Sequence, residues 1–171
     1  MNPKAVIVGV GNRLRGDDAV GCLALDELGS LTAPRSLDGV DLIDAGTVPE
    51  NQIEPIARLS PDRILFIDAC DFGGEPGEIR LFKGEETDRL AGGLVSTHTL
   101  PLNLIAGLLS QKAKAKVSLL GVQPANLEFN TGLSEPVAQA LPAVVSLARE
   151  WVRLPTGGHF SPPPTHKRTG S

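Results

Sequence analysis

Short apolar runs that alternate with helical patterns constrain this chain more than any other feature. Lys4 to Val10 and Arg63 to Ala69 are almost continuous aliphatic or β-branched segments, as expected of parallel strands buried on both faces. Further strands are predicted at Val40 to Ile43 and Lys116 to Val122, with an alternating edge strand at Gly77 to Phe82. We therefore expect a doubly wound α/β fold, with helices on both faces of a mostly parallel, twisted sheet and one antiparallel edge strand.

The segments between these strands carry helical periodicity or a helix signal. The predicted helices run over Ala19 to Leu28, Glu50 to Leu59, Leu100 to Leu109 and Glu135 to Val152. Ser134 precedes the last helix and is its predicted N-cap.

The chain of 171 residues is predicted to form one α/β domain over residues 1–154. Residues 155–171 are rich in proline, glycine and serine and are expected to be a disordered tail. His159 and His166 lie in this tail, which makes them poor candidates for metal ligands.

Composition argues against a nucleic-acid or membrane partner. The net charge is −4, and the aromatic residues are only five Phe and one Trp, with no Tyr, which argues against the basic face with interleaved stacking aromatics that a nucleic-acid binder uses. No apolar run approaches the length of a membrane span, and the first one is too short for an anchor or signal peptide. Cys22 and Cys70 show no ligand spacing, so we expect a reducing, cytoplasmic setting.

Three residues that can bind a metal each follow a predicted strand. Asp18 lies in GNRLRGDDAVG, Asp68 lies in ILFIDACD after four apolar residues, and His98 lies in STHTLPLN. Carboxyl ends of parallel strands meet at one edge of a sheet, where α/β proteins bind ligands. Two carboxylates and one imidazole there would form an open three-ligand site, and they suit Zn, Ni, Fe or Mn equally well.

Each of these residues also has a plainer explanation. Asp17 and Asp18 can both complement the start of the next helix, so we assign Asp17 to capping or structure and Asp18 to the metal. Asp68 can instead hydrogen-bond loop amides, and His98 can cap a helix. Asp44 in IDAGT is either a turn acid or a group that holds a basic ligand, and Cys70 is expected to be an inert thiol.

The first loop does not match a dinucleotide-binding fingerprint. The spacing G-x-G-x-x-G requires glycine at position 14, where the chain has leucine. Two aspartates also end the loop where a diphosphate would need bare amides. A nucleotide-binding flavodoxin-like module is therefore disfavoured.

Taken together, the motifs resemble those of the hydrogenase maturation endopeptidases. The matching segments, in chain order, are VGVGNRLRGDDAVG, DAGTVPEN, LFIDACDFGGEPGEIRLF, STHTLPLNLI and LLGVQPANLEF. The combination most resembles the branch that serves the nickel-iron hydrogenase of formate hydrogenlyase. The resemblance spans Ala5 to Trp151, with Ala19 standing where a glycine is often found.

The resemblance implies a flavodoxin-like fold and a single cut near the C-terminus of a nickel-loaded hydrogenase large-subunit precursor, after a basic residue. It implies that Asp18, Asp68 and His98 contact the nickel, which the precursor supplies and which zinc or cadmium can replace in crystals. It assigns Asp44 to the basic residue before the cut and Gly46 and Thr47 to the adjoining substrate loop. We expect a monomeric enzyme.

Two other mechanisms or functions remain open at this point. Asp18 and Asp68 can act as an aspartic-type pair, with activity independent of metal. The chain can also be a non-catalytic chaperone that binds nickel or the precursor. The leading hypothesis is cleavage by a water that the metal or one carboxylate activates.

Overall fold

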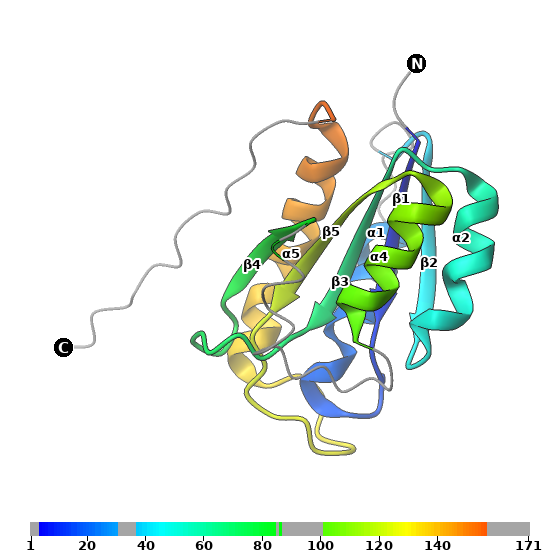
Figure 1. Cartoon of the computed structure of the whole chain (residues 1–171). Coiled ribbons are helices and arrows are strands. Elements are labelled where there is room, and N and C mark those ends of the chain that lie inside the picture. Colours follow the sequence, from blue (N-terminus) through cyan, green and yellow to red (C-terminus); the bar gives the residue numbers. More distant parts are fainter. Residues whose placement is uncertain (1–3, 31–36, 85, 87–100, 157–171) are drawn as a thin grey trace.

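The computed structural model describes residues 4–30, 37–84, 86 and 101–156. Its centre is a five-stranded sheet in the order β2-β1-β3-β5-β4 (Figure 1). Strands β1, β2, β3 and β5 are parallel, and β4 pairs antiparallel with β5 at one edge. The bounds are β1 Ala5–Val10, β2 Val40–Gly46, β3 Arg63–Ala69, β4 Ile79–Lys83 and β5 Lys116–Val122. The predicted mostly parallel sheet with one antiparallel edge strand is confirmed.

Helices cover both faces of this sheet, as the sequence predicts (Figure 1). Helices α1 (Val20–Ser30) and α5 (Glu135–Arg153) pack on one face, and α2 (Ile53–Leu59) and α4 (Leu102–Ala113) pack on the other. Alternate side chains of the fully buried strands therefore enter two separate apolar cores, one on each face.

The observed elements differ from the predicted ones mainly at their ends. Strand β2 continues to Gly46, and the predicted helix from Glu50 divides into a short 3₁₀ helix, η2 (Pro49–Gln52), and α2. Helix α4 starts after Pro101, because proline carries no N–H and restricts the residue before it. It ends at Ala113, where Lys114 adopts the left-handed conformation with φ 55°.

No helix of the described ranges combines the length and apolar character that crossing a bilayer requires. The predicted tail begins at residue 155, and residues 157–171 lie outside the described part of the chain. The division between domain and tail therefore stays a prediction.

Candidate active site at the carboxyl edge of the sheet

Two glycines let the loop after β1 lie directly against the ends of the strands. Gly11 has φ +140°, and a Cβ added there would lie 1.7 Å from the carbonyl oxygen of Asp18. A Cβ at Gly21, in the first turn of α1, would lie 2.1 Å from the carbonyl oxygen of Ile67 in β3. Any side chain at either position would push the loop away. The glycines thus bring the 3₁₀ helix η1 (Gly16–Ala19) against the end of β3.

Asp18 and Asp68 both lie buried at this edge. Asp18 in η1 is 2% exposed, and its Oδ2 accepts a hydrogen bond from the Asn12 backbone N–H at 2.9 Å. Asp68 is fully buried and lies next to the last residue of β3. Burial, followed by the charges of Asp68 and Asp18, raises the pKa of the Cys70 thiol well above its usual value. Both carboxylates are therefore close enough to act on the same buried sulfur.

That environment makes Cys70 a protonated thiol rather than a nucleophile. The side chain is 2% exposed and therefore almost completely buried. Among the described residues both cysteines are free thiols. The prediction that Cys70 is inert agrees with this burial and with its raised pKa.

Asp17 has a different function from its neighbour. Its carboxylate is fully buried and accepts hydrogen bonds from the backbone N–H groups of Ala125, Asn126 and Ser134, at 2.7–2.8 Å. The Ser134 hydroxyl also donates to it, at 2.9 Å. Asp17 is therefore structural, as predicted, but it fixes the segment between β5 and α5 instead of capping its own helix. Ser134 occupies the N-cap position of α5 without making a capping hydrogen bond, because its hydroxyl binds Asp17.

His98, the third predicted metal contact, lies outside the described residues. Within residues 4–30, 37–84, 86 and 101–156, no group of three or more His, Cys, Asp or Glu side chains is arranged to hold a metal ion. The described part of the predicted site therefore consists of two carboxylates. Buried oxygen ligands of this kind fit a divalent cation better than an anion.

The three residues that we expect to contact substrate line one open hollow of about 380 Å³. Asp44 and Gly46 come from the end of β2, and Thr47 follows it. The Gly11 N–H donates to the Gly46 carbonyl oxygen at 2.8 Å, which ties this segment to the first loop. The full lining is Gly11, Asn12, Arg13, Cys22, Asp44, Gly46 and Thr47. The structure thus brings the predicted substrate residues beside the loop that carries Asp18.

Arg13 is a residue of this hollow that the sequence analysis did not identify. Its guanidinium binds both oxygens of Asp26, at 2.5 and 2.9 Å, and Asp44 Oδ2 at 2.7 Å. These contacts join α1 to β2 across the mouth of the hollow. An arginine two residues after a glycine in a turn is common in loops and does not by itself indicate a function. Only its contacts with Asp26 and Asp44, which are distant in sequence, reveal that it links α1 to β2.

The ion pair keeps Asp44 charged. Burial raises the pKa of Asp44, but hydrogen bonds from Arg13, the Gly46 N–H and the Cys22 thiol outweigh it, so the pKa lies below its usual value. Burial, and then the charge of Asp44, raises the pKa of Cys22 to about 12. The hollow therefore presents an ionised carboxylate beside a neutral thiol at neutral pH.

Comparisons with known proteins identify the family of this chain. The family model of the HycI hydrogenase maturation proteases matches residues 28–151. The hydrogenase 3 maturation protease of Escherichia coli K12 is 33% identical over 146 residues, which cover 85% of this chain and 89% of that protein. A putative hydrogenase maturation protease of Methanocaldococcus jannaschii is 35% identical over 130 residues, covering 74% and 75%.

Comparison with solved structures identifies the same family of hydrogenase maturation proteases. The crystal structure of the [NiFe] hydrogenase maturation protease HycI from Thermococcus kodakarensis superposes with a TM-score of 0.76 at 32% identity. The match covers 89% of this chain and 94% of that one. The chain therefore belongs to the hydrogenase maturation protease family and is a peptidase.

Proposed function

We propose that this peptidase removes a short C-terminal extension from the large-subunit precursor of a nickel-iron hydrogenase, and that it does so only when the precursor carries nickel. The observation that carries the proposal is the position of two buried carboxylates, Asp18 and Asp68, at the same sheet edge as an open hollow that holds a guanidinium group. The carboxylates suit a metal cation, and the hollow suits a basic side chain of a peptide.

The nickel belongs to the substrate in this proposal, and Asp18, Asp68 and His98 are the residues that contact it. Carboxylate oxygens and an imidazole are ligands that divalent transition metals accept. When bound, nickel supplies Lewis-acid activation of a water and of the scissile carbonyl. The Asn12 N–H fixes one oxygen of Asp18 at 2.9 Å, so the chain orients this carboxylate before the precursor arrives. A precursor without nickel would lack this anchor, and its scissile bond would not be placed.

Asp44 is proposed to bind the basic residue that precedes the cut. The ion pair with Arg13 supports this assignment, because it demonstrates that the Asp44 carboxylate can accept a guanidinium at 2.7 Å in an open position. Asp44 is 39% exposed and Arg13 is 43% exposed, so a peptide can reach both. A substrate arginine or lysine would then displace Arg13 from Asp44, while Asp26 retains it. Gly46 and Thr47 line the adjoining wall.

We place the reaction in the cytoplasm. Cys22 and Cys70 are both buried free thiols, which fits a reducing compartment. Action as a monomer is part of the same proposal.

A cleavage assay on a large-subunit precursor, loaded with nickel or nickel-free, tests the proposal when read by intact mass. We expect loss of a short C-terminal peptide only from the loaded precursor. Equal cleavage of both samples would favour Asp18 and Asp68 as a metal-independent aspartic pair. Binding of the precursor without any cleavage of either sample would contradict the proposed reaction.

A further inference from the structure

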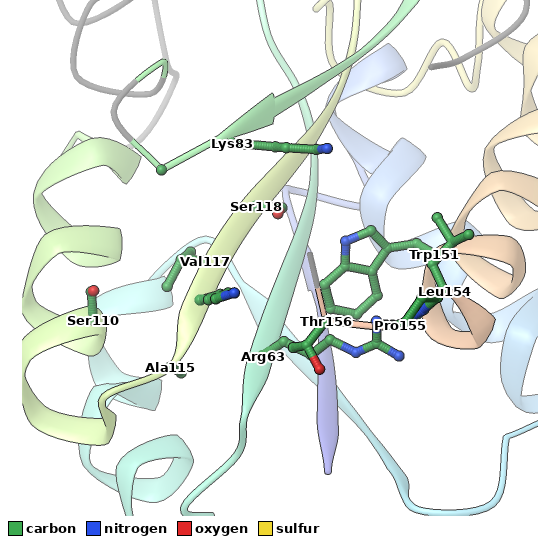
Figure 2. A pocket seen from close by; sticks show the side chains of 12 residues that line it. Arg63, Lys83, Ser110, Ala115, Val117, Ser118, Trp151, Leu154, Pro155 and Thr156 are labelled. Atoms are coloured by element: carbon green, nitrogen blue, oxygen red, sulfur yellow. Dashed lines mark hydrogen bonds between the residues drawn. The ribbon is translucent and has the colours of Figure 1, made fainter. Parts of the chain in front are cut away.

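A second cavity lies at the opposite edge of the sheet, where the parallel strands begin. Its volume is about 410 Å³, within the range of small-molecule sites. Five residue steps along β3, about 17 Å, separate Arg63 in its lining from Asp68. Figure 2 shows Trp151 from α5 and Arg63 from β3 on one side of the cavity, with Lys83 and Ser118 above them.

Strand register places the cationic side chains of this cavity on one face of the sheet. Arg63 pairs with Lys116 across β3 and β5, and Lys83 pairs with Ser118 across β4 and β5. Lys116 and Ser118 are two residues apart in β5, so both point to the same side. This is the face on which α5 packs, because Arg63 stacks on the Trp151 ring, 4.7 Å from its centroid. Strand pairing therefore places these three basic side chains near one another.

The charged side chains among the described lining residues all carry positive charge. Its charged members are Arg63, Lys83 and Lys116, and no Asp or Glu among the described residues lines the cavity. Three acids, Asp62, Glu85 and Glu150, adjoin lining residues in sequence. Asp62 accepts a hydrogen bond from the Lys4 backbone N–H, and Glu86 accepts one from the Lys83 backbone N–H. The charged residues of the described lining are basic in a chain whose overall charge is −4.

Arg63 supplies a buried donor that the fold itself does not use. The residue is 5% exposed, and its two terminal nitrogens donate to the carbonyl oxygens of Val152 and Leu154 at the end of α5. Its Nε is buried and has no hydrogen-bond partner among the described residues. A buried, unpaired N–H is unfavourable. Because this Nε has almost no accessible surface, an anion in the cavity would act on the Arg63 guanidinium through its charge and not by a hydrogen bond. Burial also lowers the pKa of Arg63, which an anionic ligand would reverse.

We propose that this cavity is a binding site for a small molecule that carries a carboxylate or phosphate group next to an apolar portion. Lys83, Lys116 and the Ser118 hydroxyl would meet the anionic group, with the Arg63 guanidinium adding its positive charge nearby. The apolar portion would lie against Trp151, Leu154 and Pro155. The described lining of this cavity shares no residue with the hollow at the carboxyl edge.

Trp151 makes the proposal directly testable, since it is the one tryptophan of the chain. Its emission can be followed on excitation at 295 nm while benzoate, inorganic phosphate or benzamide is added at constant ionic strength. Benzamide has the shape of benzoate without its charge. We expect a saturable change with benzoate, with phosphate or with both, and none with benzamide. Benzoate without phosphate would assign the site to carboxylates, and the reverse would assign it to phosphates.

Three matched variants separate the site from general surface charge. Lys83→Gln and Lys116→Gln should each raise the dissociation constant about fivefold. Lys114→Gln removes an exposed lysine outside the lining and should leave it unchanged. All three positions are on the surface or at a strand end, so the fold is retained, which far-ultraviolet circular dichroism checks. The proposal is overturned if no anion gives a saturable change, if benzamide binds equally, or if Lys114→Gln weakens binding as much as the other two.

Discussion

Buried acids lie at the carboxyl edge of the sheet and basic side chains line the cavity at its amino edge, and only part of this difference follows from the fold. In a doubly wound sheet the helices run against the parallel strands, so their N-termini lie at the carboxyl edge and their C-termini at the amino edge. Acids near helix N-termini and bases near helix C-termini are favourable for electrostatic reasons. Asp17 and Asp18 in the first turn of η1 fit this rule, as does Arg63 on the last carbonyls of α5.

Other charges at the two edges have no such explanation. Asp44 and Asp68 end strands, and Lys83 ends the antiparallel strand β4. None of the three lies in the terminal turn of a helix. The comparison teaches that helix dipoles explain which sign each edge prefers, whereas the charges on strand ends indicate where ligands bind. Substitution of an acid at a helix start and of acids near strand ends tests this distinction.

The largest effect is expected for Asp68→Asn, which neutralises the buried strand-end acid while keeping its shape. Loss of a proposed nickel contact should lower the processing rate by about a thousandfold or more. Asp38→Asn changes an exposed acid away from this edge and should process normally. Intact-mass kinetics on loaded precursor measure both. Normal processing by Asp68→Asn would remove this residue from the site.

A large effect on stability, instead of activity, is expected for Asp17→Ala. The substitution leaves three backbone N–H groups and one hydroxyl without their buried acceptor. We expect the free energy of unfolding to fall by about 3 kcal/mol, measured by urea titration. Asp71→Ala is the matched control, because exposed Asp71 also accepts two hydrogen bonds, from the Gly73 N–H and Gln123 Nε2. A similar loss in both variants would contradict the special role of Asp17.

The strands of the sheet were predicted well from the sequence. Parallel strands buried on both faces appear as short, continuous apolar runs, and few other structural elements have this pattern. Because Asp18 and Asp68 each follow a predicted strand, they were also predicted to lie at the same edge of the sheet, and the structure confirms this position. Their contacts with a metal stay a prediction. Asp44, Gly46 and Thr47 were predicted as one substrate group through family resemblance, and they do line one hollow.

Contacts between distant segments were not predictable in the same way. Asp17 and Ser134 are 117 residues apart, and either one alone has the pattern of a local helix cap. Arg13 finds its partners 13 and 31 residues away. Arg63 begins an apolar strand and Trp151 ends an amphipathic helix, and no local spacing relates them. These pairings depend on helix packing that only the folded chain defines.

A moderate effect on substrate binding is expected for Arg13→Gln. This substitution removes the guanidinium that competes for Asp44, so KM for a precursor with a basic residue before the cut should fall up to about fivefold. The turnover number should not change, because the Arg13 guanidinium bonds to Asp26 and Asp44, which lie apart from the proposed nickel contacts. Steady-state kinetics separate the two constants. A rise in KM would indicate that Arg13 itself contacts the precursor.

The pKa of Asp44 also predicts how this step depends on pH. Because the pKa in the folded chain lies below that of an unfolded aspartate, the carboxylate stays charged at neutral and mildly acidic pH. Its pairing with Arg13 therefore stabilises the fold above the unfolded pKa, and this contribution is lost as the pH falls through the folded value. KM for a basic residue should accordingly stay constant through the mildly acidic range and rise only in stronger acid.

The smallest effect is expected at Cys22, which reports the negative charge of the carboxyl edge. Its pKa is raised to about 12 by burial and then by Asp44, whose Oδ1 lies 3.4 Å from the sulfur. Asp44→Asn removes the charge but not the burial, so the thiolate fraction at pH 9 should rise only a few fold. The rate of alkylation by iodoacetamide in a Cys70→Ala background measures it. An unchanged rate would mean that burial alone sets the reactivity of Cys22, and the acidic edge would then act on ligands only through direct contact.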